Sequence, residues 1–446
     1  MSVAPPTLVV TLFLAAQQQV PAPARIIVGE NIPVSRGRET RPLTEPHLAA
    51  HPTDPRVLLA GVIISSRVDS EVFGPRQVCA AYRSSDGGRT WERHDFEIRG
   101  CGDPWVGITP DGQAVFTALG THSAVTQQDG GLLVFHSADG GRTWDEAPVG
   151  LGRGHDHQTV AVDATGGKRS GSIYVVSGKG VRADDGKLRW SVFVARSADG
   201  GKRFFRPFSF IPSNLNINAD VPVVLSDGEL VVSYSDFQRN VDEFTREGRL
   251  ERARSWIIKS TDGGGTFSIP LFATEACGPG WSSLAVDGSS GPYRDRLYLV
   301  CMGRDGGTIV LHRSEDRGEK WSDPIRVHQA ADTAVPRSHP VIAVNKDGAV
   351  AIAWQDGRNG PRPTCREVYF TASLDGGRRF LPEQKVSSLA SCPDSTTDGA
   401  AFKRWPTGGD YYGLAATSDG LFHVLWSDSR TGGFQLWTAT VEVRKP

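Results

Sequence analysis

The sequence lacks several features that mark common classes of enzyme and membrane protein. Its formal net charge is only −1 over 446 residues, so no global field favours nucleic acid or an anionic membrane. It has no P-loop, dinucleotide fingerprint, C-x-x-C pair or H-E-x-x-H motif, which argues against a nucleotide enzyme or a zincin. Its longest apolar run is too short to span a bilayer. We therefore expect no nucleic-acid partner and no transmembrane segment.

Glycine, proline and tryptophan are plentiful by contrast, with 51, 28 and 11 copies, which suits many short strands joined by tight turns. One eight-residue phrase also occurs six times. Its copies begin at Ser84, Ser137, Ser197, Ser260, Ser314 and Ser373. Successive starts lie 53, 60, 63, 54 and 59 residues apart. A period of this size indicates a repeat architecture in which each unit packs on its neighbours.

The phrase is clearest in residues 84–91, Ser-Ser-Asp-Gly-Gly-Arg-Thr-Trp. Its carboxylate can accept neighbouring backbone N–H groups, and its glycines permit positive φ without steric cost. The final Trp or Phe returns the chain to an apolar layer. The six acids of the copies are Asp86, Asp139, Asp199, Asp262, Asp316 and Asp375. We expect these turns to serve the scaffold rather than the chemistry.

These residues resemble the Asp-box, or bacterial neuraminidase repeat, of the sialidase-like β-propellers. In that family the boxes lie between the third and fourth strands of a blade, on the face opposite the active site. The resemblance covers most of the chain and implies an all-β propeller. It also implies a glycan as the partner and a glycoside hydrolase as the class of enzyme.

Counting apolar strand pairs gives seven units against six boxes. The last unit ends in residues 434–441 and supplies three strands, and residues 25–32 offer the fourth. Closing the ring in this way removes two exposed sheet edges. We therefore predict one domain, residues 25–446, that forms a seven-bladed β-propeller with its N-terminal strand in the last blade. Six blades, the sialidase number, is the alternative. The charged stretch 236–255 is interpreted as a solvated loop or as a lid over the pocket.

The N-terminal segment and the cysteines both indicate an exported protein. Residues 1–24 contain a short apolar core and an A-x-A-like site, which predicts a signal peptide and a secreted or periplasmic protein. The six cysteines form an even set whose neighbours are 22, 24 and 27 residues apart. We predict the disulfides Cys79–Cys101, Cys277–Cys301 and Cys365–Cys392.

If the boxes mark one face, the starts of the first strands and the ends of the second strands mark the other. Acids, histidines, arginines and aromatics are concentrated at those positions, as a ligand pocket requires. The predicted catalytic residues are Tyr411, Asp410, Asp103, Glu45 and Asp356. The predicted substrate-binding residues are Arg239, Arg304, Arg358, Arg430, His155, His157, Trp105, Trp281, Tyr412 and His339. Turn-capping acids and Asp-x-Arg braces between blades are the alternative explanation.

Sialidases hold the substrate carboxylate with three arginines, activate a Tyr with a Glu, and use an Asp as acid and base. The segment 410–414, Asp-Tyr-Tyr-Gly-Leu, resembles their late Tyr-Ser-x-Leu segment and would place Tyr411 at the nucleophile. Their Phe-Arg-Ile-Pro-type motif is absent, because Asn31-Ile32-Pro33 carries no arginine. We therefore expect a glycosidase other than a true sialidase, with the pairs Glu45/Asp103 or Asp356/Asp410 as candidates.

Other readings of the same positions stay open. The pocket could serve a non-catalytic carbohydrate- or protein-binding module, or the propeller could be a scaffold. Strand alternation would put His155 and His157 on one face, near Asp103 and His339, where they could bind a metal. We predict no cofactor, with a structural Ca²⁺ as the one option, and a monomer.

Overall fold

The fold is described from a computed structural model of the chain. The structure describes residues 23–36, 40–65, 76–126, 130–182, 186–211, 213, 215–240, 249–278 and 282–445. Most of the predicted signal peptide, residues 1–22, lies outside these ranges. Among the described residues, the one helix is too short and too polar to cross a membrane.

The strands form seven antiparallel sheets, which confirms the predicted number of blades. Blades 1 to 3 comprise β3 (Leu43–Ala50), β4 (Leu58–Ile64), β5 (Val78–Ser84) and β6 (Glu92–Phe96); β7 (Arg99–Ile108), β8 (Ala114–Thr121), β9 (Gly131–Ser137) and β10 (Val149–Gly150); and β11 (His155–Val162), β12 (Ile173–Arg182), β13 (Leu188–Ser197) and β14 (Phe205–Phe210). In each of them the strands pair in sequence order.

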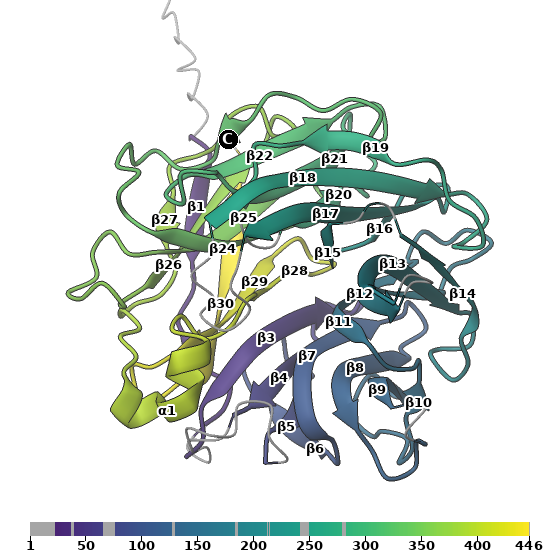
Figure 1. Ribbon diagram of the computed structural model, residues 1–446. Coiled ribbons are helices and arrows are strands. Elements are labelled where there is room, and N and C mark those ends of the chain that lie inside the picture. Colours follow the sequence, from purple (N-terminus) through teal and green to yellow (C-terminus); the bar gives the residue numbers. More distant parts are fainter. Residues whose placement is uncertain are drawn as a thin grey trace, which may run out of the picture.

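The next three blades repeat this pattern, with a split first strand in blade 4. They comprise β15 (Asn216–Ala219), β16 (Val223–Val224), β17 (Leu230–Asn240), β18 (Arg249–Ser260) and β19 (Leu271–Thr274); β20 (Ser283–Val286), β21 (Leu297–Met302), β22 (Ile309–Ser314) and β23 (Ile325–Arg326); and β24 (Arg337–Val344), β25 (Val350–Asp356), β26 (Glu367–Ser373) and β27 (Gln384–Lys385). The sheets follow one another around a common centre (Figure 1).

Blade 7 joins the two ends of the chain. It comprises β28 (Gly413–Ala416), β29 (Phe422–Asp428), β30 (Gln435–Arg444), β1 (Arg25–Val28) and β2 (Ile32–Pro33). β1 pairs antiparallel with β30, with Arg25 opposite Arg444, and β28 contacts β3 of blade 1. The N-terminal strand therefore completes the last blade as predicted, and the ring closes without leaving β30 as an open edge.

The six Asp-box turns, which begin at the serines named above, share one hydrogen-bond pattern. Each serine ends the third strand of its blade, and its Oγ donates to the Asp Oδ1 at 2.8–2.9 Å. Gly87 and Gly88 have φ of 75° and 84°, the left-handed conformation that the turn requires. Arg317 takes the place of the first glycine in the fifth copy and keeps a φ of 60°. The fifth turn therefore keeps the geometry of the others although its sequence differs at this position.

The three predicted disulfides are present. Cys79–Cys101 joins β5 to β7 and so links blades 1 and 2, whereas Cys277–Cys301 lies within blade 5. Cys365–Cys392 closes a segment of 27 residues beside blade 6. Three disulfides are consistent with an extracellular location.

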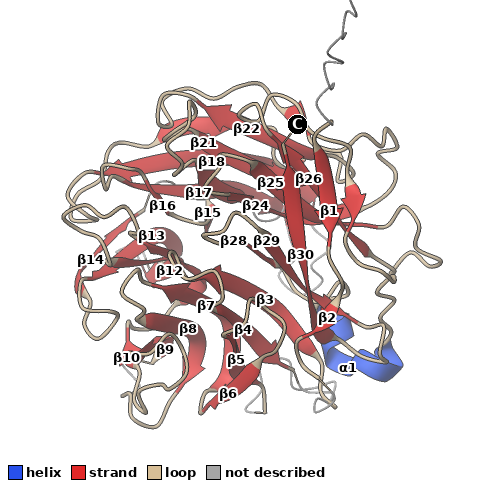
Figure 2. Ribbon diagram, turned by 180° about the vertical axis from the view of Figure 1, so that it is seen from behind, coloured by secondary structure: helices blue, strands red, loops and turns tan. Residues whose placement is uncertain are grey.

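Two segments depart from simple blades. The prediction of a loop or lid over residues 236–255 is wrong for both ends of this range, because β17 continues to Asn240 and β18 begins at Arg249. Residues 241–248 lie outside the described ranges. The second segment precedes blade 7 and contains α1 (Ser395–Arg404), whose N-cap Asp394 accepts the N–H groups of Thr396 and Thr397. α1 lies beside the ring rather than in a blade (Figure 2).

Candidate functional site

Four first strands begin with the same backbone irregularity. Glu45, Asp103, His157 and His339 have φ between 49° and 54°, which is rare for residues other than glycine. Each lies where the pairing of its strand shifts register, in blades 1, 2, 3 and 6. A bulge of this kind re-aims a side chain and is enriched beside active sites. In the first strands of four blades, a bulge therefore interrupts the usual alternation of side chains and turns a polar residue to a new direction.

His157 is surrounded by three carboxylates from three blades. Its Nδ1 lies 3.2 Å from Asp156 Oδ1, and its Nε2 lies 3.9 Å from Asp410 Oδ2. The backbone N–H of His157 donates to Asp103 Oδ2 at 2.9 Å. Burial alone would lower the pKa of His157, but the charges of these acids raise it well above its usual range. His157 is therefore an imidazolium at neutral pH.

Asp410 behaves differently from the other acids of this group. Burial opposes its ionisation, yet the hydrogen bond with His157 and the charge of Arg404 lower its pKa to about 2. Arg404 Nη2 lies 3.5 Å from Asp410 Oδ2 and comes from the last turn of α1. Asp410 is therefore ionised over the whole physiological pH range.

Glu45 and Tyr411 form a buried pair between blades 1 and 7. The Tyr411 hydroxyl donates to Glu45 Oε2 at 3.4 Å. Burial raises the pKa of Glu45 well above its usual range, and the charges of Asp103 and Asp410 raise it further. Burial and the same acids also raise the pKa of Tyr411. The carboxyl of Glu45 and the phenol of Tyr411 therefore hold their protons far longer than exposed groups would.

A narrow cavity of about 40 Å³ lies beside these groups. Its lining consists of Trp105, His157, Gln158, Thr159, Asp220, Val221, Ser282, Ser283, His339, Pro340, Val341, Asp410, Tyr411 and Tyr412. The ring centroids of Trp105 and Tyr411 lie 5.2 Å apart, and those of His339 and Tyr412 lie 5.6 Å apart. Glu45 and Asp103, which are 1% and 6% exposed, lie behind this wall. The aromatic lining and the convergent polar groups suit a small ligand.

The structure brings eight of the predicted site residues to the cavity or directly behind it. They are Glu45, Asp103, Trp105, His157, His339, Asp410, Tyr411 and Tyr412. They come from blades 1, 2, 3, 6 and 7, so the site is built across the ring rather than on one strand. The Glu45/Asp103 pair is thus in place, although neither carboxyl opens directly into the cavity.

Asp356, Arg358 and Arg430 are held elsewhere. Asp356 Oδ2 is paired with Arg337 Nε at 2.9 Å and with Arg358 Nη2 at 2.6 Å, and the residue is fully buried. Arg430 is paired in the same way with Asp428 in the next blade. The prediction that Asp356 and Asp410 form a catalytic pair is not supported, because two arginines already neutralise Asp356. The alternative explanation, an Asp-x-Arg brace, describes both motifs.

Arg304, another predicted ligand-binding residue, does not line the cavity. Arg304 is an exposed turn residue between β21 and β22. The side chain of Arg239 and the whole of Trp281 lie outside the described residues. A three-arginine clamp for a carboxylate is therefore not seen among the described residues, where Arg404 is paired with Asp410 beside the cavity.

His155 does not share a face with His157, so that prediction is wrong. The register shift between Asp156 and Thr159 and the positive φ of His157 break the strand alternation. His155 instead hydrogen-bonds Ser177 Oγ at 2.8 Å and is buried against Phe193, and burial lowers its pKa to about 4. Two histidines therefore do not converge on a metal.

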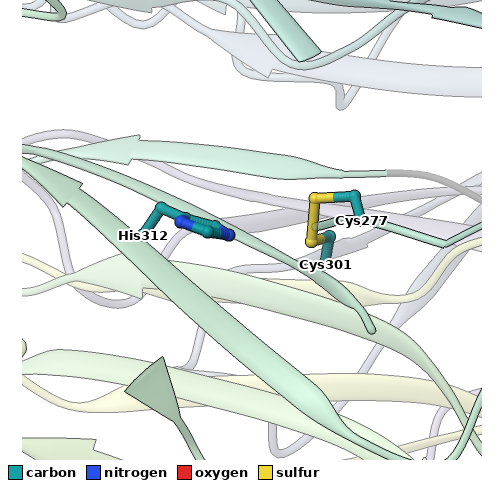
Figure 3. A group of neighbouring side chains, drawn as sticks. All are labelled: Cys277, Cys301 and His312. Carbon is teal, nitrogen blue, oxygen red and sulfur yellow. A yellow bond between two sulfur atoms is a disulfide. The ribbon is translucent and has the colours of Figure 1, made fainter. Parts of the chain in front are cut away.

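Two groups of described residues nonetheless have the spacing of metal ligands. Ligand atoms of Asp103, Asp156 and His157 lie within 4.8 Å of one another. The other group, Cys277, Cys301 and His312, is shown in Figure 3. Its two sulfur atoms are joined in a disulfide and offer no thiolate, and His312 Nδ1 bonds the carbonyl of Ser322. This second group is therefore structural.

Sequence reasoning missed Arg404. Asp156 and Asp220 belong to the polar residues found at the starts of the first strands, but they were not among the predicted catalytic or substrate-binding residues. Arg404 lies in a segment without a counterpart in the other blades, so the repeat gave no position for it. A local signal existed for the bulges: Glu45, Asp103 and His339 each precede a proline at the start of a first strand. An acid or histidine directly before a proline in a first strand is therefore the residue with positive φ at the bulge.

Comparison with known proteins adds information on the fold. No protein-family model matches the chain, and no curated protein matches its sequence. A protein of unknown function from Dyadobacter fermentans DSM 18053 is similar in structure, with a TM-score of 0.53 and 12% identity over 94% of this chain and 99% of that chain.

Two sialidases match less well. A Hadza microbial sialidase gives a TM-score of 0.48 at 13% identity and covers 93% of this chain and 96% of its own. A Trypanosoma rangeli sialidase gives 0.47 at 12% identity, covering 93% of this chain and 59% of its own. At such identity the Dyadobacter likeness shows the propeller fold alone, so the chemistry of this chain has to come from its own cavity.

Proposed function

We propose that this chain is a secreted propeller that binds a glycan in its axial cavity and hydrolyses a glycosidic bond there. One observation carries the proposal: acids with opposite pKa shifts surround a single aromatic-walled cavity. The pKa of Glu45 is raised well above its usual range, whereas that of Asp410 is lowered to about 2. Environments that push the pKa values of neighbouring acids apart are typical of acid–base catalysis. The resemblance of the six turns to the Asp-boxes of sialidase-like propellers is a further argument, by analogy, for a glycan as the ligand.

Tyr411 is the proposed nucleophile and Glu45 its base. The Tyr411 ring lines the cavity, and its hydroxyl already lies 3.4 Å from the Glu45 carboxylate. A base within hydrogen-bond reach of the nucleophile is the usual arrangement for covalent catalysis, and such bonds are often long without substrate. In its carboxylate form Glu45 would accept the phenol proton as the phenol oxygen attacks the anomeric carbon, and the raised pKa of Glu45 makes that carboxylate a stronger base.

His157 is the proposed acid. It lines the cavity and is an imidazolium because Asp103, Asp156 and Asp410 surround it. Its proton would pass to the leaving glycosidic oxygen, and neutral His157 would later take a proton from the water that cleaves the glycosyl–tyrosine bond. Glu45 then returns its proton to Tyr411, which restores the starting state. Asp410 holds His157 in place and stabilises positive charge on the sugar ring.

A hydrolysis screen over neutral, acidic and amino-sugar glycosides tests the proposal. Tyr411→Phe and His157→Asn should each abolish turnover while thermal unfolding stays close to that of the wild type. Asp139→Asn, the same kind of change in an Asp-box turn, is the matched control and should leave turnover intact. Turnover that survives Tyr411→Phe would exclude the covalent route.

A non-catalytic glycan-binding propeller is the second candidate. The deep burial of Glu45, at 1% exposed, favours it, because a buried acid can stabilise a fold without taking part in chemistry. Calorimetry separates the two: a glycan that binds the cavity without being cleaved by the wild type supports binding alone.

A further inference from the structure

Asp220 is a cavity residue that the proposed chemistry leaves unused. It follows β15 in blade 4, is fully buried, and lines the cavity on blade 4, whereas His157 and Asp410 come from blades 3 and 7. Its Oδ2 accepts hydrogen bonds from Ser282 at 2.6 Å and from Ser235 at 3.3 Å. Its Oδ1 has no hydrogen-bond partner among the described residues. A buried carboxylate oxygen without a donor is costly unless a ligand or an ordered water pairs with it, and this one belongs to a residue that lines a cavity.

The neighbours of Asp220 are neutral. Its partners are the hydroxyls of Ser282 and Ser235 and the backbone of Ser282, and burial raises its pKa to about 7 because these hydrogen bonds only partly offset desolvation. An acid paired with arginine, such as Asp356, has a lowered pKa instead. Asp220 is thus a carboxylate whose ionised form lacks a counter-charge.

The charges around the rest of the cavity are also predominantly negative. Among the described residues of the lining there is neither a lysine nor an arginine. His157 and Arg404 provide positive charge, but both already face Asp410, and His157 also faces Asp103 and Asp156. Burial lowers the pKa of His339, which favours its neutral form. A ligand carboxylate would therefore meet an excess of like charge, whereas a ligand cation would be stabilised.

We propose that the cavity selects a sugar that carries a free primary ammonium group, and that Asp220 binds this group through Oδ1. The inference rests on the proposed glycan function and specifies its substrate class. A charge-assisted N–H···O bond to Asp220 would pair the unpartnered oxygen and supply the missing counter-charge. An acetylated amine would bring a neutral amide to the same position and lose that charge.

Other lining groups fit the body of an amino sugar. The Nε1 of Trp105 and the Oε1 of Gln158 are buried and unpartnered among the described residues, so a donor and an acceptor are available for hydroxyl groups. The rings of Trp105, Tyr411 and Tyr412 supply apolar walls, and their faces attract a nearby cation.

The test is a calorimetric comparison of three probes on the full protein at about pH 7. They are β-1,4-linked glucosamine oligomers, the matched N-acetylglucosamine oligomers, and 3′-sialyllactose. We expect the free amine to bind at least about tenfold more tightly than the acetylated form, a difference of one charged contact. Sialyllactose should bind more weakly than either. Equal or tighter binding of the acetylated or sialylated probe by the wild type overturns the proposal without any variant.

Asp220→Asn keeps the shape of the side chain and removes its charge. It should abolish the preference for the free amine and leave the affinity for the acetylated probe within about twofold. Asp139→Asn is the control and should keep the preference. A preference that persists in Asp220→Asn, in protein that unfolds at the wild-type temperature or above, excludes Asp220 as the binding residue.

The two proposals fail in different ways. Binding of the amino sugar without turnover removes the hydrolase and leaves the assignment of Asp220 intact. Cleavage of a neutral or acetylated glycan without any amine preference does the opposite. Absence of binding by all three probes, together with no hydrolysis in the screen, rejects both.

Discussion

The Asp-box turns and the axial cavity both depend on aspartates, but the two ends of the ring hold them in different ways. In an antiparallel blade the third strand runs parallel to the first, so a turn after the third strand lies opposite the start of the first. At the box end, Asp139 takes all its hydrogen bonds from residues 137–143 of its own turn. At the cavity end, Asp410 is held by His157 of blade 3 and Arg404 beside α1.

The pKa directions record this difference. Local donors lower the pKa of Asp86, Asp139, Asp199, Asp262 and Asp375 despite partial burial. At the cavity end the pKa values diverge, with Glu45, Asp103 and Asp220 raised and Asp410 lowered. A carboxylate that is satisfied within one loop stabilises the fold, whereas acids crowded from several blades leave charge available to a ligand.

Removing the phenol of Tyr411 should give the largest effect. Tyr411→Phe is expected to lower turnover by at least about 10³-fold, because the nucleophile is lost, while the free energy of unfolding changes by about 1 kcal/mol or less. Single-turnover kinetics and thermal unfolding on the same preparation measure the two effects. A loss of stability in proportion to the loss of activity would instead mark Tyr411 as structural.

The pH dependence of stability separates the two ends next. The pKa of Asp220 is raised from 3.8 to about 7, so its protonated form stabilises the fold below about pH 3.8 and this stability is lost as the pH rises through 7. In Asp220→Asn this loss, on the order of 4 kcal/mol between the two pKa values, should disappear. Chemical denaturation of both proteins at about pH 4 and pH 8 tests this. If the free energy of unfolding changed with pH to the same extent in both proteins, the raised pKa could not belong to Asp220.

Opening the Cys365–Cys392 disulfide should link stability to the site. The bond closes 27 residues, and the chain after it carries α1, Arg404 and Asp410. Cys365→Ser with Cys392→Ser is expected to cost roughly 3 kcal/mol and to weaken ligand binding. Cys277→Ser with Cys301→Ser is the matched control, with 24 residues closed, and should lower stability to a similar degree without changing affinity.

Changing an Asp-box acid should give the smallest effect. Asp139→Asn loses charge-assisted bonds at an exposed turn and should cost about 1 kcal/mol near neutral pH. Because the pKa of Asp139 is lowered in the folded state, this difference should fade as the pH falls below the ordinary Asp value. Denaturation at about pH 7 and pH 3 is the measurement; a loss of glycan binding would show that the two ends are coupled.

Much of the fold was predictable because its signals are local. Asp-Gly turns such as Asp111-Gly112 and Asp347-Gly348 fix where first and second strands meet, and the six boxes fix where third strands end. The pairing of β1 with β30 followed from counting strands, since an incomplete blade leaves an open edge. The disulfides followed from pairing cysteines that lie 22, 24 and 27 residues apart along the chain.

The site was predictable only in part, because its members are brought together by the ring. Glu45, Asp103, Asp410 and Tyr411 could be named as polar ends of strands, but Asp356 has the same sequence character and is neutralised by two arginines. The bulge at His157 breaks the strand alternation, so His157 and His155 do not lie on one face as predicted. Arg404 lies in a segment that the repeat does not describe.

The order of strands, the turn chemistry and the closure of the ring were therefore written in the sequence, since each depends on residues close together along the chain. The tertiary structure alone decided which charges face one another, because the electrostatics of a buried group depend on distances between blades. That is why the pKa of Asp410 is lowered, the pKa of Glu45 is raised and Asp220 lacks a counter-charge, although all three acids lie in or beside the first strand of a blade.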